Sequence, residues 1–364
     1  MLVAPLSAGQ QRIVSIYFPQ GVQVSRRSYT PWIYLHGVHT GRWFVSDNPQ
    51  WQQLRSMWPI PLGGSAQADK LGILTGSLML SSGSSSSSSS SMNSSAGGGG
   101  LVKDGSYILI VPEATGRVDD AQMWNSRFWP CFAAVPKCVD TQLDDVGFVA
   151  DLLTNLQQQL LQGVPLKPKA LLSGYSNGGM LAQALLCQQP SVASRLAGVS
   201  ILASALGEQF AGGSCKGQLP ASLPVLWVHG TADDTLPYGR AVSEGVQMLG
   251  AEGAVKLWAA RMGCPTSAIA NPVKIHTDSS RAVACKNYCS HQQQQRREKQ
   301  LPAASKQQQQ QKQQQQLQPV VLCTVSGAPH QLLKVMPGYP AALMRWAAPR
   351  EAAGAAFTGA PRLF

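Results

Sequence analysis

Short apolar runs alternate along this chain with stretches whose apolar residues recur at helical spacing. The apolar runs predict strands at Arg12–Phe18, Trp32–Gly37, Tyr107–Pro112, Ala170–Tyr175, Leu196–Ala203, Pro224–His229 and Pro319–Val325. Helical spacing predicts helices at Asp144–Leu161, Asn177–Cys187, Arg240–Leu249 and Ala254–Met262. Strands that alternate with helices favour an α/β fold, with a mainly parallel sheet and helices on both faces. Ligands bind such sheets at the carboxyl ends of the strands, so the candidate chemistry has to be sought there.

Two low-complexity segments interrupt this pattern. A Ser/Gly-rich insert covers residues 75–106, and a Gln-rich insert covers residues 291–318. Segments of this composition bury little surface, so we expect both to be disordered surface loops, and residues 351–364 to form a flexible tail. With the inserts set aside, the remainder predicts a single domain that spans residues 9–350.

Composition and charge narrow the function classes. The chain has 364 residues, of which 44% are hydrophobic, so it can bury a sizeable core. No apolar run reaches the ~18 residues that would span a bilayer, so we expect no membrane partner. The net charge is +11, but the Gln-rich insert alone holds five basic residues and one acid. No aromatic–basic motif accompanies the remaining charge, so we expect no nucleic-acid partner.

A candidate nucleophile stands between a predicted strand and a predicted helix. The segment Gly174-Tyr175-Ser176-Asn177-Gly178 contains the pattern G-x-S-x-G. In a strand–turn–helix context this pattern forms a sharp turn that presents the Ser hydroxyl at the top of the sheet. The helix that follows favours negative charge at its N-terminus. The sequence therefore predicts that Ser176 is a nucleophile.

A nucleophilic serine needs a base and an acid, which follow it in the chain in the order acid, then histidine. The loop after the strand Pro224–His229 offers two acids, Asp233 and Asp234, and the residues alone leave both open. His330 follows the last predicted strand through a loop of small residues, so we expect it to be the base. We expect His229 to be structural.

The oxyanion of an acyl-transfer intermediate needs two backbone N–H donors. We expect one from Asn177, the residue after the nucleophile, and one from Val38, which follows Gly37 at the end of a predicted strand. His36 and His39 lie nearby, and we expect them to make local hydrogen bonds rather than to act as catalysts.

The eight cysteines permit disulfides but do not fix their connectivity. Cys187 and Cys323 lie in apolar surroundings, which is typical of buried thiols. Cys285 and Cys289 have no second pair of ligands at the spacing of a zinc site, so we expect no metal and no cofactor.

The chain resembles the polyhydroxybutyrate depolymerase and feruloyl esterase group of α/β-hydrolases. The segments that carry the resemblance are Leu35-His36-Gly37, Trp124-Asn125, Asp144-Asp145-Val146-Gly147-Phe148, Gly174-Tyr175-Ser176-Asn177-Gly178-Gly179-Met180, His229-Gly230-Thr231-Ala232-Asp233 and Trp258-Ala259-Ala260-Arg261-Met262-Gly263-Cys264. By this resemblance the fold is an α/β-hydrolase fold and the acid is Asp233. Relatives usually carry Trp-Pro-Gly soon after the histidine, whereas this chain has Pro337-Gly338 without a Trp.

The resemblance implies a secreted-type serine carboxylic-ester hydrolase that acts through an acyl-enzyme. Its substrates would be feruloyl or acetyl esters of plant polysaccharide, or short polyhydroxyalkanoate esters. Tryptophans that could stack on a sugar or a ferulate are Trp43, Trp51, Trp124 and Trp129. The group is often disulfide-bridged, which makes Cys264 with Cys285 the expected pair. We expect a monomer.

Two questions stay open from sequence alone. The altered segment after His330 and the basic Gln-rich insert keep an alternative function in view, an inactive hydrolase scaffold that acts as a binding protein. The resemblance places the protein outside the cell, whereas Met1 to Gln11 is too short and too weakly apolar for a signal peptide, which leaves a cytoplasmic location as the alternative. We expect the first strand at Arg12.

Overall fold

The computed structural model describes a set of segments separated by gaps. They are residues 2–5, 11–17, 28–40, 107–118, 121–129, 131–132, 137–138, 140–156, 161, 163–215, 217, 219–220, 223–243, 245–264, 269–276, 281–289, 320–336, 339, 343 and 346. Both predicted inserts, the tail at 351–364, Trp43 and Trp51 lie outside the described residues.

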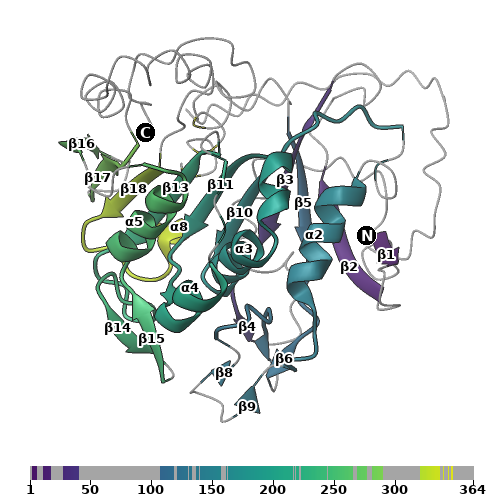
Figure 1. Ribbon diagram of the computed structural model, residues 1–364, viewed down its shortest axis with the longest axis horizontal. Helices are drawn as coiled ribbons and strands as arrows, with labels where there is room; N and C mark the ends of the chain where they lie inside the picture. The colour runs from purple at the N-terminus through teal and green to yellow at the C-terminus, as the bar shows by residue number, and fades with distance from the viewer. Residues whose placement is uncertain are drawn as a thin grey trace, which may run out of the picture.

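One ten-stranded sheet organises these segments (Figure 1). In spatial order its strands are β1 (Leu2–Pro5), β2 (Gln11–Tyr17), β5 (Tyr107–Pro112), β3 (Thr30–Leu35), β10 (Ala170–Tyr175), β11 (Leu196–Leu202), β13 (Val225–Gly230), β18 (Val320–Val325), β17 (Ala282–Asn287) and β16 (Ile269–His276). The strands from β5 to β18 run parallel, while β1, β2, β17 and β16 add antiparallel pairs at the two edges. The carboxyl ends of the parallel strands therefore meet along one edge of the sheet.

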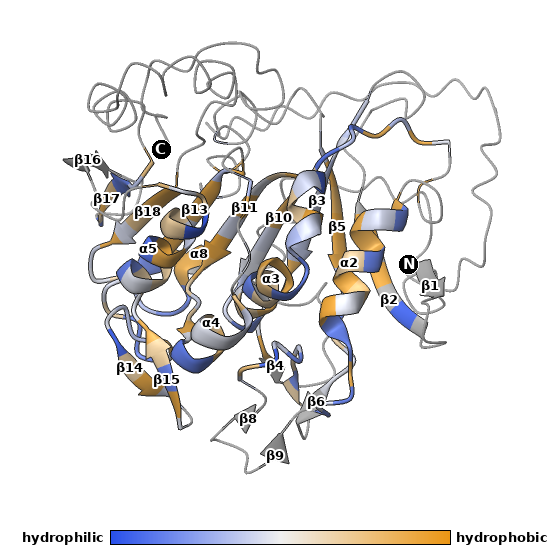
Figure 2. Cartoon of the chain, in the orientation of Figure 1, coloured by the Kyte–Doolittle hydropathy of each residue, from blue (hydrophilic) through white to orange (hydrophobic). Residues whose placement is uncertain are grey.

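The strands are apolar on both faces because helical segments cover both (Figure 2). In β3, Ile33 and Leu35 belong to one core cluster, and Trp32 and Tyr34 belong to the other. The first cluster lies under the helices α2 (Asp145–Asn155), α3 (Asn177–Gln188), α4 (Glu208–Ser214) and α5 (Ala251–Arg261), with the 3-10 helix η4 (Pro190–Arg195). The second lies under the short helix α8 (Leu332–Val335) and Trp346. This is the predicted arrangement, a mainly parallel sheet with helical cover on both faces, and it is that of an α/β-hydrolase fold.

Small sheets lie beside the main one. Their strands are β12 (Leu206–Gly207), β14 (Ala241–Ser243) and β15 (Val246–Leu249) in one, β4 (His39–Thr40), β6 (Arg117–Val118) and β7 (Ala121–Gln122) in a second, and β8 (Cys131–Phe132) and β9 (Lys137–Cys138) in a third. No described helix is long and apolar enough to cross a membrane.

The predicted helix Arg240–Leu249 is wrong, because these residues form the hairpin β14–β15. Ala241 pairs with Met248, and Ser243 pairs with Val246. The apolar residues fit a helical spacing, but Gly245 has φ +72°, a left-handed conformation that glycine adopts readily in a tight turn. The tight turn at Gly245 therefore favours a hairpin, although the spacing of the apolar residues favours a helix. The expected first strand at Arg12 is also wrong, since β1 begins at Leu2.

Among the described residues, three disulfides are present, and they correct the cysteine predictions. The pairs are Cys187–Cys215, Cys264–Cys289 and Cys285–Cys323. The expected pair Cys264–Cys285 is wrong because Cys285 faces Cys323 across the paired strands β17 and β18. The prediction of free buried thiols at Cys187 and Cys323 is wrong as well. Disulfides with loops of this length stabilise a fold by roughly 3–4 kcal/mol each and indicate an oxidising compartment.

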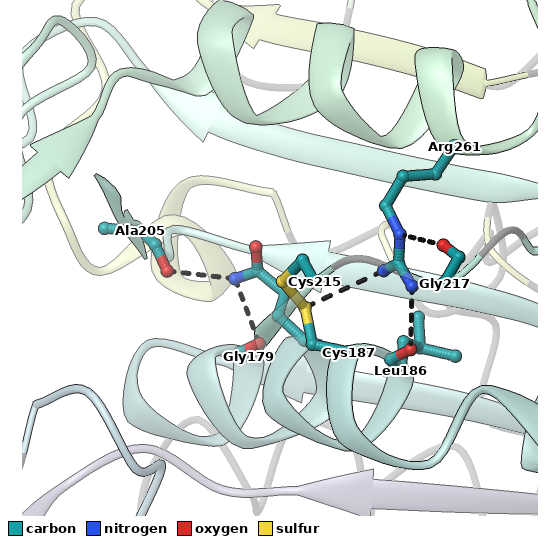
Figure 3. Close-up of a disulfide and its surroundings, with 8 residues drawn as sticks. Gly179, Leu186, Cys187, Ala205, Cys215, Gly217 and Arg261 are labelled. Atoms are coloured by element: carbon teal, nitrogen blue, oxygen red, sulfur yellow. Dashed lines mark hydrogen bonds between the residues drawn. A yellow bond between two sulfur atoms is a disulfide. The ribbon is translucent and has the colours of Figure 1, made fainter. Parts of the chain in front are cut away.

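The bridge between Cys187 and Cys215 lies beside a buried cation (Figure 3). Arg261 donates a hydrogen bond of 2.7 Å to the carbonyl of Gly217 and one of 3.4 Å to that of Leu186 in the last turn of α3. A cation at a helix C-terminus satisfies carbonyls that have no partner within the helix. The disulfide and Arg261 together hold the far end of the helix that begins at Ser176.

Candidate active site

The backbone at Ser176 takes the strained form expected of a nucleophile at a sharp turn. Ser176 lies between β10 and α3 with φ 53° and ψ −121°, a conformation that costs energy for any residue other than glycine. A Cβ atom at Gly178 would lie 2.2 Å from the carbonyl oxygen of Leu35, so only glycine fits where the new helix crosses β3. Ser204 donates a hydrogen bond of 2.8 Å to the Ser176 carbonyl and holds the turn from β11.

Ser176, His330 and Asp233, which follow β10, β18 and β13, form a connected chain of hydrogen-bonding groups at the carboxyl edge of the sheet. The Nε2 atom of His330 lies 2.9 Å from the Ser176 Oγ atom. The Nδ1 atom of His330 lies 2.8 Å from Oδ2 of Asp233 and 3.1 Å from Oδ1. All three side chains are buried. Since Asp233 fixes the proton on Nδ1, Nε2 is left to accept the proton of Ser176.

The carboxylate of Asp233 is held by several donors. The backbone N–H groups of Thr235 and Leu236 donate to Oδ1 at 3.0 and 2.8 Å, and Nε2 of His229 lies 3.3 Å from Oδ2. Burial alone would raise the pKa of Asp233, but hydrogen bonds from His229 and His330, the charge of His330 and the N–H of Leu236 hold the pKa well below its usual range. Asp233 is therefore ionised at neutral pH. Asp234, the other candidate acid, is exposed and lies against Thr235.

The position of His330 is set by the side chain of Tyr175, the residue before the nucleophile. The Tyr175 hydroxyl donates a hydrogen bond of 3.1 Å to the His330 carbonyl, and the two rings lie 5.4 Å apart. The altered sequence after His330 thus does not displace the imidazole, because the backbone of His330 is bonded to Tyr175 of β10.

The loop after β3 brings the expected oxyanion donors close to the nucleophile. A Cβ atom at Gly37 would lie 3.1 Å from Cβ of Ser176, which places the Gly37 backbone directly beside the serine. Val38 follows it and is half-buried, and Asn177 is the first residue of α3. The structure therefore places the loop before Val38 and the N-terminus of α3, which begins at Asn177, beside the same serine.

His36 uses both ring nitrogens within this loop. Its Nε2 atom accepts a hydrogen bond of 3.1 Å from the backbone N–H of Ala114, so Nδ1 carries the proton and donates to the carbonyl of Gly37 at 2.6 Å. His36 therefore makes local hydrogen bonds, as the sequence predicts. The side chain of His39 lies outside the described residues.

The structure describes two of the four tryptophans proposed as a stacking surface. Trp124 and Trp129 are buried in the core, which overturns their prediction as substrate-binding residues. Trp124 instead donates its indole N–H to the carbonyl of His36 at 3.0 Å. Trp43 lies outside the described residues.

Sequence reasoning gave other roles to two residues that touch the site, since it expected His229 to be structural and Trp124 to stack on the substrate. His229 is buried against Asp233, and Trp124 contacts both His36 and Asn177. The signal for His229 was its position four residues before the acid, at a strand end. Within the described part of the chain, no group of three or more His, Cys, Asp or Glu side chains is placed to hold a metal ion.

Comparison with known proteins gives distant structural likenesses. No protein-family model matches this sequence, and neither does any curated protein. A thermostable esterase is 12% identical with a TM-score of 0.37, and the match covers 72% of this chain but only half (50%) of that one. Est1E from Butyrivibrio proteoclasticus with bound ferulic acid is 10% identical (TM-score 0.34, 64% and 80% covered). SOBER1 from Arabidopsis thaliana is 15% identical (TM-score 0.31, 65% and 85% covered). At these values the likeness identifies neither an activity nor a substrate for this chain.

Proposed function

We propose that this protein is a serine carboxylic-ester hydrolase that works through an acyl-enzyme. The observation that carries the proposal is the continuous contact from Ser176 through His330 to a buried, ionised Asp233. A serine in strained backbone beside two backbone N–H groups, with a base already in contact, is the arrangement that acyl transfer requires. The residues of the chain supply every step, so the proposal includes no metal and no cofactor.

In the proposed mechanism, Oγ of Ser176 attacks the ester carbonyl while Nε2 of His330 takes its proton. Asp233 orients the imidazole and stabilises the imidazolium that forms. The backbone N–H groups of Val38 and Asn177 hold the oxyanion of the tetrahedral intermediate. His330 then protonates the departing alcohol, and the acyl-enzyme remains. A water molecule that gives its proton to His330 attacks the acyl group and releases the acid and free Ser176.

For the substrate we propose feruloyl or acetyl esters of plant polysaccharide, or short polyhydroxyalkanoate esters, cleaved outside the cell. The support is the sequence resemblance around Ser176 and Asp233, together with three disulfides that fit an oxidising compartment. Turnover of feruloylated arabinoxylan against a hydroxybutyrate oligomer separates the two classes. A rate at least ten times higher on one of them, written as kcat/KM, assigns the class.

The activity itself is tested with p-nitrophenyl acetate and the variant Ser176→Ala. We expect the variant to lose roughly 10⁴- to 10⁶-fold in kcat, since removal of a nucleophile removes the covalent route. Ser173→Ala is the matched control, because Ser173 is buried in the same strand but faces Trp32, and we expect it to retain activity within a few-fold. A fluorophosphonate probe should label the wild type and neither Ser176→Ala nor His330→Ala. A wild type no faster than Ser176→Ala would instead support a binding protein on a hydrolase scaffold.

A further inference from the structure

Trp124 lies between the two segments that would bind the oxyanion. Its side chain is fully buried. The centre of its ring lies 4.9 Å from that of His36, with the two planes tilted, and 6.5 Å from that of Phe148 in α2, with the planes nearly parallel. It makes hydrogen bonds both to the loop after β3 and to the first residue of α3. These segments are 88 and 53 residues away in sequence, so Trp124 is a bridge between otherwise separate parts of the site.

On the loop side, Trp124 fixes the orientation of a peptide plane. Its indole N–H donates to the carbonyl of His36 at 3.0 Å, and His36 in turn donates to the carbonyl of Gly37 at 2.6 Å. In a planar trans peptide the N–H points opposite to the C=O. A Gly37 carbonyl drawn toward His36 therefore turns the N–H of Val38 to the other side of the loop. Trp124 holds His36, the residue that orients this peptide, through a hydrogen bond to its carbonyl and a contact with its ring.

On the helix side, Trp124 binds Asn177 with its backbone. The N–H of Trp124 donates to Oδ1 of Asn177 at 2.7 Å, and Nδ2 of Asn177 donates to the Trp124 carbonyl at 3.2 Å. This pair of bonds fixes the side chain of Asn177, whose own backbone N–H is the second proposed oxyanion donor. Trp124 therefore connects the loop of Val38 with Asn177, the residues of the two proposed oxyanion donors.

The segment of Trp124 is itself anchored to the framework. The N–H of Asn125 donates to Oδ2 of Asp145 at 2.7 Å, and its side-chain amide donates to the carbonyl of Leu143 at 2.8 Å. Asp145 forms a buried ion pair with Arg12 on β2 at 2.7 Å. A small movement of Trp124 is therefore resisted by α2 and by β2, which is what a positioning element requires.

We propose that Trp124 is a positioning residue that sets the spacing of the oxyanion donors Val38 and Asn177. The inference rests on the proposed ester hydrolysis. Its consequence is specific: loss of the indole N–H weakens the binding of the transition state and leaves the binding of the substrate ground state unchanged.

The test is Trp124→Phe, which keeps an aromatic ring and removes the N–H. We expect kcat on p-nitrophenyl acetate to fall roughly 10- to 100-fold, less than deletion of an oxyanion donor costs, with KM within about threefold. Affinity for a trifluoromethyl ketone, which forms an oxyanion on Ser176, should weaken in parallel with kcat/KM. Trp258→Phe is the matched control, since Trp258 is equally buried in the same core cluster and no described residue accepts from its Nε1 atom. It should lose stability and keep kcat.

Each outcome decides the matter. A wild type without esterase activity overturns the proposed function and this inference with it. An active wild type with Trp124→Phe within twofold of its kcat, or with Trp258→Phe equally slowed at the same folded fraction, overturns the inference alone. Where Trp124→Phe does not fold, Asn177→Ala breaks the same bridge from α3 and must show the same split between kcat and KM. When both variants fold, their combined loss should be smaller than the product of the single losses, because they remove one unit.

Discussion

Two carboxyl groups stand at strand ends with almost the same burial and opposite electrostatics. Asp233 follows β13 and is 5% exposed, and Glu113 follows β5 and is 6% exposed. Burial pushes the pKa of both upward, but Asp233 has hydrogen bonds from His229, His330 and Leu236 that reverse the shift. No described residue donates a hydrogen bond to the carboxyl of Glu113, and burial raises its pKa to about 7. Partners, rather than burial, therefore decide which carboxyl is charged.

The difference suits the two sides of the proposed site. A charge at Asp233 stabilises the imidazolium of His330, whereas Glu113 lies next in sequence to a residue that contacts the loop of the proposed oxyanion donor Val38. Glu113 precedes Ala114, whose N–H binds His36 beside Gly37. With a pKa of about 7, the Glu113 carboxyl is about half protonated at neutral pH, so it carries less negative charge than an ordinary glutamate would at that position. The acid side therefore has a fully charged carboxylate, whereas the carboxyl at the end of β5 is only partly charged.

Removal of the charge on the acid side has the largest expected effect. Asp233→Asn should lower kcat about 10⁴-fold, close to 5 kcal/mol of transition-state stabilisation, because the amide leaves His330 in the wrong tautomer. The measurement is kcat on p-nitrophenyl acetate at pH 7 to 8, with near-UV circular dichroism to verify the fold. Asp234→Asn is the control, since Asp234 is exposed, and should change kcat less than threefold. A reversal of these two results would reassign the acid to Asp234.

This part of the site could be predicted from sequence because chain order and local motifs carry it. The pattern around Ser176 predicts the sharp turn that carries the nucleophile. Asp233 and His330 each follow a predicted strand, at the positions where an acid and a base are expected. Parallel strands place their carboxyl ends together, so residues 154 apart in sequence come into contact. This argument from parallel strands predicts where the site lies, but it does not predict the order of the strands in the sheet.

Long-range partners of single residues could not be predicted in this way. Cys285 bonds Cys323 because β17 and β18 pair in one register, and no spacing in the sequence states that register. Trp124 is apolar enough for a core or a binding surface, and only the position of His36 decides between them. The hairpin at β14–β15 depends on one left-handed glycine, Gly245, within an otherwise helical pattern. In each case a tertiary contact or a turn overrides a local signal.

The raised pKa of Glu113 should affect the pH dependence of the free energy of unfolding rather than the rate of catalysis. A folded-state pKa near 7 against an unfolded value near 4.5 means that the native state holds the proton more tightly. Its contribution is therefore fully present below about pH 4.5 and is lost as pH rises through 7, a change of roughly 3 kcal/mol. Glu113→Gln should remove this loss of stability. The measurement is thermal unfolding of the wild type and the variant from pH 5 to 8.5. Parallel curves would show that Glu113 ionises in the fold as it does in water.

The smallest effect concerns the partner that keeps Asp233 ionised. Nδ1 of His229 accepts a hydrogen bond of 3.4 Å from the indole of Trp227, so Nε2 carries the proton and faces Leu236 and Asp233. His229→Leu removes this donor, which raises the pKa of Asp233 and loosens its carboxylate. We expect kcat to fall about 5- to 30-fold, the cost of one lost hydrogen bond to a buried charge, with KM nearly unchanged.

His229→Gln separates this effect from simple packing, because the amide presents an N–H at a similar reach. It should recover most of the lost kcat, while both variants lose some thermal stability through the altered contact with Tyr238. Equal kcat in the Leu and Gln variants would mean that His229 only fills space, and that the backbone donors of Thr235 and Leu236 suffice for Asp233. Recovery in the Gln variant would instead show that the acid side depends on a donor from its own strand, as we propose that the oxyanion side depends on Trp124.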